Sequence, residues 1–259
     1  MSNSPRILIF DIEVAPITAY VWQLFDQNVA LNQIKSDWFL LSWAAKWLGD
    51  PASKTMYMDN SRAKEIQNDK ALVMGLAALI NEADVIITQN GDSFDVKKLN
   101  ARAIINKLPP IKPVRSIDIL KEGRKVFKFT SHKLEYITSV LNDKYKKLKH
   151  EEYPGFELWS AIMKGDKHAW AVMKKYCIHD VLSTEEAYTK LAPWIKTGRV
   201  TDFMVGCKCG SNKLQARGYA VSVAGRYARY QCQDCGKWLK SPTNEYTAQQ
   251  KQNILREGK

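Results

Sequence analysis

The 259-residue sequence contains no apolar run approaching the ~18 to 20 residues that a membrane-spanning helix requires. The stretch from Ile7 to Phe10 is too short to be the apolar core of a secretory signal peptide. These two absences predict a cytoplasmic protein, and we expect a bacterial or viral one. The sequence has only five cysteines, and in a reducing compartment we do not expect them to form disulfide bonds.

Acidic residues are fewer than basic ones: the sequence has 27 Asp and Glu and 39 Lys and Arg, which gives a formal net charge of +12. Between Lys97 and Lys149 there are 15 basic residues and 4 acidic ones. Such a block attracts a polyanion, although most lysine-rich stretches are simply solvated faces. We favour nucleic acid as the partner, because the block lies between two of the acidic motifs described next.

The first acidic motif is the octet Arg6-Ile-Leu-Ile-Phe-Asp-Ile-Glu13. Its four apolar residues predict a strand buried on both faces. Asp11 and Glu13 follow two positions apart, so in a strand they point to the same side. Two acids at the end of a buried strand are costly without a cation, and Mg²⁺ or Mn²⁺ suits them. From the octet alone, a strand tip that reaches solvent explains the pattern equally well.

Two further motifs extend this pattern. Asn90-Gly-Asp-Ser-Phe-Asp95 follows another apolar run, and Tyr176-Cys-Ile-His-Asp180 lies in a helical stretch. Tyr176 and Asp180 share a helix face because they are four residues apart.

The ordered set Asp11, Glu13, Asp95, Tyr176 and Asp180 closely resembles the DEDD 3′→5′ exonucleases of the tyrosine subclass. That family includes the proofreading domains of family B DNA polymerases and has a ribonuclease-H-like fold. The resemblance covers about residues 5 to 195. The histidine subclass has its histidine five residues before the last Asp, where this sequence has Lys175. Val14 departs from the Thr or small residue that often follows the Glu, which leaves contacts to the terminal sugar open.

The resemblance implies two Mg²⁺ or Mn²⁺ ions about 3.5 to 4 Å apart, held by the four carboxylates, with Asp11 bridging them. Tyr176 would orient the attacking water, since an unperturbed tyrosine pKa of about 10 argues against a general base. The expected substrate-binding residues combine the resemblance with the basic block: Asn90, Phe94, Lys97, Lys98, Arg102, Arg124, Lys125, Lys128 and Lys133.

Apolar periodicity predicts an α/β fold of the ribonuclease-H-like type, with a mixed sheet flanked by helices. The expected strands are 7–10, 39–47, 54–58, 85–88 and 114–117. The expected helices are 62–82, 94–106, 119–126, 132–141, 156–163 and 167–191. We expect Cys177 to pack in the core, and His179 to lie on the helix surface or behind the metal ligands. We expect the same core placement for Trp22, Trp38, Trp43 and Trp47, although a tryptophan near the cleft could stack on a base.

Composition changes after Pro193, and two cysteine pairs flank short β-prone runs. Cys207, Cys209, Cys232 and Cys235 predict a small β zinc ribbon with one structural Zn²⁺. The first pair has one intervening residue where two are usual, so Cys207 is the weakest of the four as a ligand. Cations interleaved with aromatic residues in this segment suit single-stranded nucleic acid, and protein docking is the alternative.

The predicted domains are a nuclease at residues 1–197, a zinc ribbon at 203–242 and a flexible polar tail at 243–259. The predicted function is a stand-alone, metal-dependent 3′→5′ exonuclease acting on single-stranded or frayed DNA ends, with RNA also possible. The alternatives are a structure-selective endonuclease on branched DNA and a nucleic-acid-binding adaptor with an inactive nuclease fold. The ribbon is also a candidate site for a replication or recombination protein.

Overall fold

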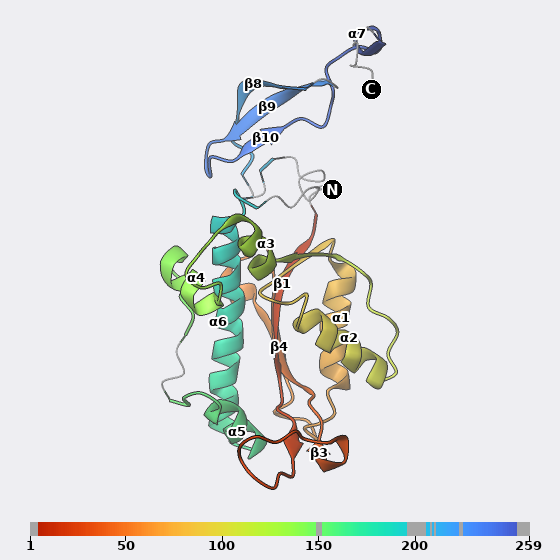
Figure 1. Cartoon of the computed structure of the whole chain (residues 1–259), viewed down its shortest axis with the longest axis vertical. Helices are drawn as coiled ribbons and strands as arrows, with labels where there is room; N and C mark the ends of the chain where they lie inside the picture. The colour runs from red at the N-terminus through yellow and green to blue at the C-terminus, as the bar shows by residue number, and fades with distance from the viewer. Residues whose placement is uncertain are drawn as a thin grey trace. The chain divides into compact units, whose positions relative to one another are not determined.

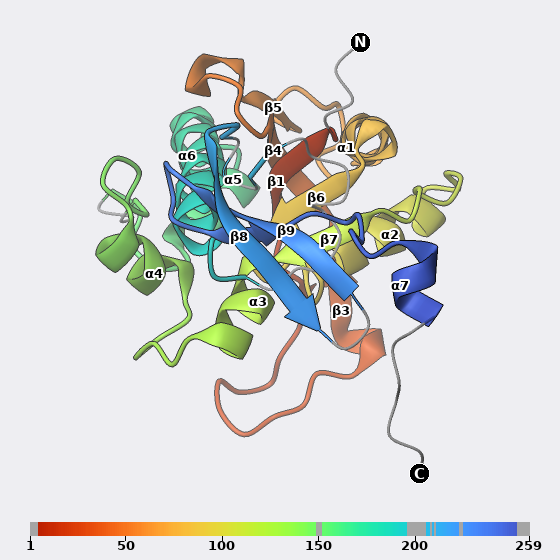
Figure 2. The ribbon, with the colours of Figure 1, turned by 90° about the horizontal axis from the view of Figure 1, so that it is seen from above.

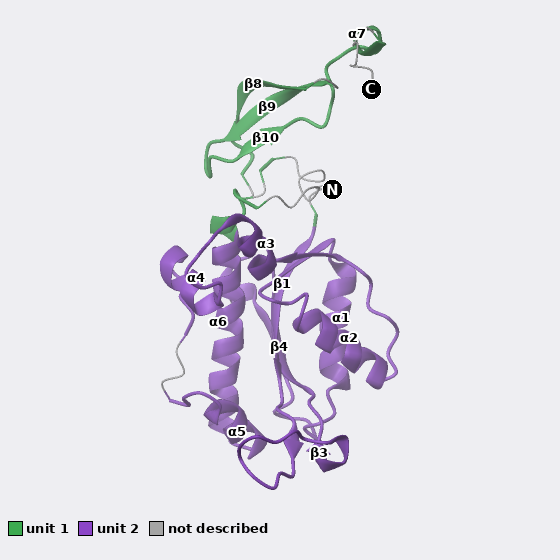
Figure 3. Ribbon diagram, in the orientation of Figure 1, with its two compact units in different colours: residues 1–5, 189–259 green, residues 6–188 purple. Residues whose placement is uncertain are grey.

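The structure is a computed structural model that describes residues 5–148, 152–195, 206–207, 209, 211–222 and 225–252. The chain forms two compact units (Figure 3). One unit is Arg6–Tyr188, and the other combines Met1–Pro5 with Thr189–Lys259. In the part of the chain that is described, no helix has both the length and the apolar content to cross a lipid bilayer.

The larger unit is built on a five-stranded mixed sheet (Figure 1). Its strands, in spatial order, are β5 (Met56–Asp59), β4 (Leu40–Trp47), β1 (Ile7–Val14), β6 (Val85–Thr88) and β7 (Arg115–Asp118). β1 and β4 are antiparallel, as are β4 and β5, whereas β1, β6 and β7 run parallel. The α/β class predicted from the sequence, with a mixed sheet flanked by helices, is confirmed.

Alternate side chains of β1 enter one apolar core. Leu8, Phe10 and Ile12 pack with α1 (Lys70–Glu82) and α2 (Asp95–Ile105). The core on the other side of the sheet contains Phe39 and Leu41, together with residues of α5 (Glu157–Met163) and α6 (Lys167–Leu191). In both views, α1 and α6 lie on opposite sides of the sheet (Figures 1 and 2). Asp11 and Glu13 therefore face the α6 side.

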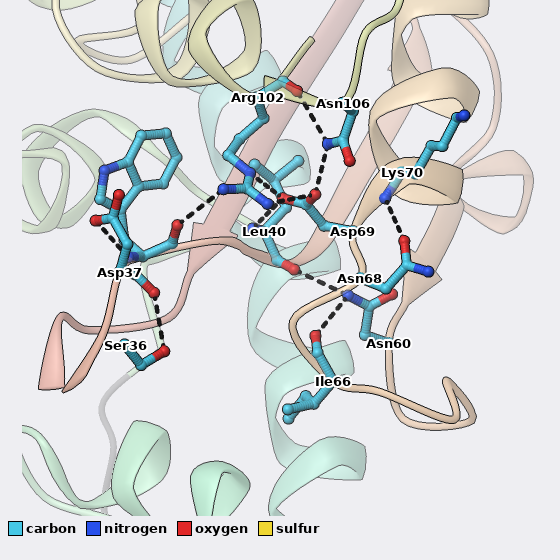
Figure 4. Close-up of polar contacts among 11 residues, drawn as sticks. Ser36, Asp37, Leu40, Asn60, Ile66, Asn68, Asp69, Lys70, Arg102 and Asn106 are labelled. Atoms are coloured by element: carbon cyan, nitrogen blue, oxygen red, sulfur yellow. Dashed lines mark hydrogen bonds and ion pairs between the residues drawn. The ribbon is translucent and has the colours of Figure 1, made fainter. Parts of the chain in front are cut away.

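The predicted helix 62–82 was wrong at its start, because α1 begins only at Lys70. Asn60 donates from Nδ2 to the carbonyl oxygens of Leu40 and Ile66, at 3.1 Å each (Figure 4). These two bonds hold the segment between Asn60 and α1 in a turn. Asp69, directly before the helix, is fully buried and accepts the backbone N–H of Leu40 at 2.9 Å. These long-range contacts hold the segment outside the helix, and helical periodicity does not reveal them.

Arg102 makes an ion pair with Asp69 (Figure 4). Its Nε and Nη2 donate to the two carboxylate oxygens at 2.6 and 2.9 Å, and only 9% of the residue is exposed. The sequence predicts Arg102 to be a substrate-binding residue. The structure shows its guanidinium neutralising the buried Asp69, so it is not available as a phosphate contact.

The remaining elements of this unit are shorter. α3 (Ile119–Val126) and α4 (Leu134–Leu141) follow β7 and lie on the α6 side of the fold. β2 (Thr18–Ala19) and β3 (Ile34–Ser36) form a small antiparallel pair that follows β1 in the chain. The 3₁₀ turn Leu31–Gln33 comes directly before β3. A second 3₁₀ turn, Ala52–Lys54, leads into β5.

The smaller unit contains a three-stranded antiparallel sheet in the order β10 (Trp238–Lys240), β9 (Gly225–Cys232) and β8 (Leu214–Ser222). The segment expected to be a flexible tail includes a short helix, α7 (Ala248–Gln252). Before it, the backbone N–H of Glu245 donates to the carbonyl of Arg226 at 2.7 Å. This contact ties the start of the tail to β9.

Candidate functional site

Three carboxylates from two elements meet beside the sheet. Asp11 and Glu13 come from the end of β1, and Asp180 comes from α6. One carboxylate oxygen from each lies within 4.8 Å of the others. The last β1 residue paired with β6 is Ile9, so both β1 acids lie beyond that pairing. The convergence brings the first and last acidic motifs together.

Asp95 lies next to this three-carboxylate cluster. It is the first residue of α2, is 3% exposed, and accepts the backbone N–H of Ile12 at 3.1 Å through Oδ1. This bond places Asp95 against the strand residue between Asp11 and Glu13. Its charge contributes to raising the pKa of Asp11. Among the described residues, its oxygens are not within the 4.8 Å group formed by the other three acids.

The turn before Asp95 is fixed by backbone geometry. Asn90 has a positive φ of 65°, and its N–H donates to Oδ1 of Asp118 at 2.9 Å. A Cβ atom on Gly91 would lie 2.2 Å from Oγ1 of Thr88, so this position requires glycine. Asp118 also caps α3 by accepting the N–H groups of Leu120 and Lys121. Asp118 was not identified from the sequence. An acid between a predicted strand and a predicted helix is the signal that could have indicated this helix cap.

The acids affect one another's protonation. Burial raises the pKa of Glu13 to about 8, and the charge of Asp180 adds to the effect. Burial and the charge of Asp95 raise the pKa of Asp11 well above its usual value. Burial also raises the pKa of Asp95 to about 7, although the N–H of Ile12 partly offsets it. Closely spaced buried oxygens that repel one another in this way fit a divalent, oxygen-preferring cation, which would favour their ionised forms.

Lys147 is the one cation that the structure places in contact with this cluster among the described residues. Its Nζ is 2.8 Å from Oδ2 of Asp180 and 4.8 Å from the ring centroid of Tyr176. Burial lowers the pKa of Lys147, but attraction to Asp180 outweighs this and raises the pKa overall. The ammonium is therefore charged and partly balances the carboxylates. It belongs to the predicted basic block, yet its position did not follow from the sequence.

Tyr176 stands on the same face of α6 as Asp180, as the spacing predicted. It is 8% exposed, and burial followed by the charge of Asp180 raises the pKa of its phenol. The hydroxyl thus stays protonated at neutral pH. That state suits a group that orients a water molecule and does not suit a general base.

Two other side chains complete the surroundings. Trp159 on α5 donates a hydrogen bond to Glu13, which lowers the pKa of that acid against the larger effect of burial. Cys177 is fully buried, as predicted, and its Sγ lies 3.9 Å from the carbonyl oxygen of Asp11. His179 contacts the carbonyl of Lys146 through Nε2, so it supports the segment that carries Lys147. Sequence reasoning did not identify Trp159.

The expected substrate-binding residues occupy different environments. Lys98 lies with Nζ 3.6 Å from the ring centroid of Trp38 and 5.4 Å from that of Phe94, the residue directly before Asp95. Lys125 pairs with Glu122 at 2.7 Å. The other basic side chains of the set are exposed: Lys97, Arg124, Lys128 and Lys133. Their roles stay predictions.

The expectation for the tryptophans held only in part. Trp43 is 5% exposed and donates from Nε1 to the carbonyl of Leu72, whereas Trp38 and Trp47 are partly buried. Trp22 is 96% exposed, so its predicted place in the core was wrong. It lies in the long connection between β2 and β3. Neither strand continues through it, so no sheet pairing draws its apolar residues into the core.

A second group of metal-type ligands lies in the smaller unit. The sulfur atoms of Cys207, Cys209, Cys232 and Cys235 all lie within 4.8 Å of one another. The Sγ–Sγ distance is 3.5 Å for Cys207–Cys235 and 3.6 Å for Cys209–Cys232. Tetrahedral Zn²⁺ with Zn–S bonds of about 2.3 Å separates its sulfurs by about 3.8 Å, so the four thiols fit this ion.

The sulfurs differ in their electrostatics, and the thiolate form is favoured at Cys232. Burial raises the pKa of Cys209 to about 11, while backbone N–H groups of Cys235 and Asp234 outweigh burial and lower that of Cys232 to about 6. Gly236, with a φ of 73°, closes the second knuckle by donating its N–H to the carbonyl of Cys232. Backbone donors around the sulfurs stabilise thiolates, which are the zinc-binding form.

Comparisons with known proteins agree with this architecture. The family model of the RNase H superfamily matches residues 31–192. A family B DNA polymerase from the hyperthermophilic archaeon Pyrobaculum calidifontis is structurally similar over 73% of this chain, with 18% sequence identity and a TM-score of 0.50. The match spans 25% of the polymerase chain. Comparison with curated proteins found no match. The family match begins after β1, so it does not include Asp11 and Glu13.

Proposed function

Because this chain belongs to the RNase H superfamily, we propose that it is a metal-dependent 3′→5′ exonuclease that hydrolyses DNA at single-stranded or frayed 3′ ends. The observation that carries the proposal is the convergence of Asp11, Glu13 and Asp180 within 4.8 Å, with Tyr176 on the helix face of Asp180. The motif order supports the 3′→5′ exonuclease assignment, and the fold supports the broader class of nuclease. RNA remains a second possible substrate.

The carboxylates are the metal-binding groups of this proposal. Asp11, Glu13 and Asp180 would hold Mg²⁺ or Mn²⁺ directly, and Asp95 would complete the ligand set from the start of α2. When bound, such ions supply a nucleophilic water and stabilise the negative charge that develops on the phosphate. The raised pKa values of Glu13 and Asp95 mean that ion binding has to release protons near neutral pH.

Tyr176 would orient the attacking water through its protonated hydroxyl. Phe94 directly precedes Asp95 and is 36% exposed, so it is available to the terminal nucleotide. The exposed cations Lys97, Arg124, Lys128 and Lys133 would contact phosphates without reading sequence. We assign the nuclease to residues 1–197 and a structural zinc ribbon to residues 203–242, with residues 243–259 as the tail.

End-labelled oligonucleotides, single-stranded and duplex, test the proposal in the presence of Mg²⁺, Mn²⁺ or EDTA. We expect a ladder that shortens from the 3′ end and disappears with EDTA. Discrete internal cuts would instead indicate a structure-selective endonuclease. Binding without cleavage in every metal would indicate an inactive adaptor.

Matched variants locate the activity. Asp11→Asn and Asp180→Asn should abolish cleavage and leave binding largely intact, since other cations hold the phosphates. Asp92→Asn is the control, because Asp92 lies in the same motif as Asp95 but pairs with the exposed Lys121 at 2.9 Å. Wild-type rates in either test variant would contradict the site assignment.

A further inference from the structure

The ribbon sheet has two chemically different faces. Side chains alternate along β9, and directly paired residues of neighbouring antiparallel strands share a face. Trp238 pairs with Gln231, and Lys240 pairs with Arg229. Together with Tyr227, these residues form what we call the aromatic–cationic face: Tyr227, Arg229, Gln231, Trp238 and Lys240. The opposite face carries Tyr219, Val221, Arg226, Tyr230 and Leu239.

The aromatic–cationic face alternates rings and charges. The guanidinium of Arg229 lies 4.9 Å from the ring centroid of Trp238, and Nζ of Lys240 lies 4.9 Å from that of Tyr227. Trp238 is 52% exposed, and both cations are exposed. The Trp238 ring is therefore accessible in the smaller unit, the Tyr227 ring is partly buried, and a cation lies beside each.

No acid neutralises this face within the described part of the ribbon. Asp234 pairs with Lys213 at 3.5 Å, and Glu245 pairs with Arg226 on the opposite face at 3.7 Å. Arg229 donates only to the backbone carbonyl of Arg217, at 3.4 Å, among its described hydrogen bonds. The positive charge is thus concentrated on one side, where it complements a polyanion.

We propose that the aromatic–cationic face binds single-stranded nucleic acid. Trp238 and Tyr227 would stack on bases, while Arg229 and Lys240 would contact the flanking phosphates. Stacking on protein rings requires unstacked bases, so the face should favour a single strand over a duplex. Every base has an aromatic face, so we expect little sequence preference.

The inference takes its class of ligand from the proposed function, but it concerns a separate binding site. The experiment measures the affinity of the full-length, zinc-loaded Asp11→Asn protein for a fluorescent oligo-dT of about 15 nucleotides, by anisotropy. In that background, Trp238→Ala should weaken binding about tenfold, and Trp238→Phe should restore most of it. Arg229→Gln should reduce the slope of log affinity against log salt by ~0.7.

Residues of the opposite face provide matched controls. Tyr219→Ala removes a ring that is 44% exposed, and Arg226→Gln removes a cation already neutralised by Glu245. Both should leave affinity within about twofold of the parent, a small change beside the stacking effect. Zinc content measured for each variant shows that its ribbon is folded. Unchanged affinity in zinc-loaded Trp238→Ala would overturn the proposal and leave the face as a protein-docking surface. Equal losses from both faces would overturn it too.

The result is separable from the nuclease proposal. In a protein with an intact Asp11, Trp238→Ala should cleave at the parent rate once substrate is saturating. A protein that binds through Trp238 but never cleaves would contradict the nuclease and support the face. If the parent protein cleaves and Trp238→Ala binds normally, the nuclease proposal is supported and the binding face is contradicted.

Discussion

The ammonium Nζ of Lys147 lies 2.8 Å from Oδ2 of Asp180, within the carboxylate cluster that we assign to metal binding. Only 24% of the lysine side chain is exposed. In the metal-free protein it therefore acts as an internal counter-ion. A divalent ion bound by Asp180 would lie close to this ammonium, and the two positive charges would repel each other.

Replacing Lys147 should consequently strengthen metal binding. We expect Lys147→Met to bind Mn²⁺ about tenfold more tightly, because a neighbouring positive charge no longer repels the ion. Its metal-free form should melt at a lower temperature, since the acids lose their counter-ion. Calorimetric titration and thermal melting measure these two effects. Lys144→Met, in the same segment but exposed, is the control. Weaker Mn²⁺ binding in Lys147→Met would contradict this repulsion.

Tyr176→Phe should slow cleavage by ~10²- to 10⁴-fold without changing Mn²⁺ affinity, because the hydroxyl orients water and is not a metal ligand. Single-turnover rates and metal titration separate the two effects. Tyr57→Phe offers a comparison, since Tyr57 is a partly buried tyrosine whose pKa is also raised and which approaches Ser42 and Asp59. A decrease smaller than about threefold in Tyr176→Phe would mean that the ring merely packs.

The ribbon should contain one zinc ion per chain. Cys232→Ser or Cys235→Ser should abolish zinc binding and raise hydrogen exchange across residues 203–242, because so small a sheet needs the metal to fold. Exchange in Arg6–Tyr188 should stay unchanged. Cys177→Ala should retain the zinc, since Cys177 is buried in the larger unit. Metal analysis without zinc in protein purified without chelator would rule out the ribbon site.

Glu186 predicts a pH dependence of stability. Burial acts to raise its pKa, but the backbone N–H groups of Tyr145 and Asp143, at 2.7 Å each, outweigh this and lower it. A lowered folded-state pKa contributes stability above the unfolded value of about 4.3, which is lost as pH falls through the folded value. At pH 7, Glu186→Gln should therefore lower the melting temperature by about 2 to 4 °C.

The difference between Glu186→Gln and the parent should shrink as pH falls from the unfolded value of about 4.3 through the lower folded-state pKa, below which Glu186 is protonated in both states. Glu135→Gln is the control, because Glu135 is exposed on α4. Thermal melts across this pH range measure the effect. A difference that is constant with pH would show that the carboxylate charge of Glu186 is not what stabilises the segment.

The order of elements followed from the sequence because local periodicity sets it. Alternation placed Asp11 and Glu13 on one side of β1, and helical spacing placed Tyr176 with Asp180. The paired cysteines indicated a metal-sized cluster, and their sulfurs do converge. In each case the relevant residues lie a few positions apart, or share a motif whose geometry is local.

Only the tertiary structure decided which of these faces meet and what else joins them. Lys147 was one of many lysines until packing placed it against Asp180, and Arg102 looked like a phosphate ligand until the buried Asp69 paired with it. Trp22 is an apolar residue of the kind that packs in cores. It lies in the connection between β2 and β3, where nothing in the described part of the larger unit covers it. Contacts between residues tens of positions apart depend on how whole elements pack, and the periodicity within one element carries no information about its partner.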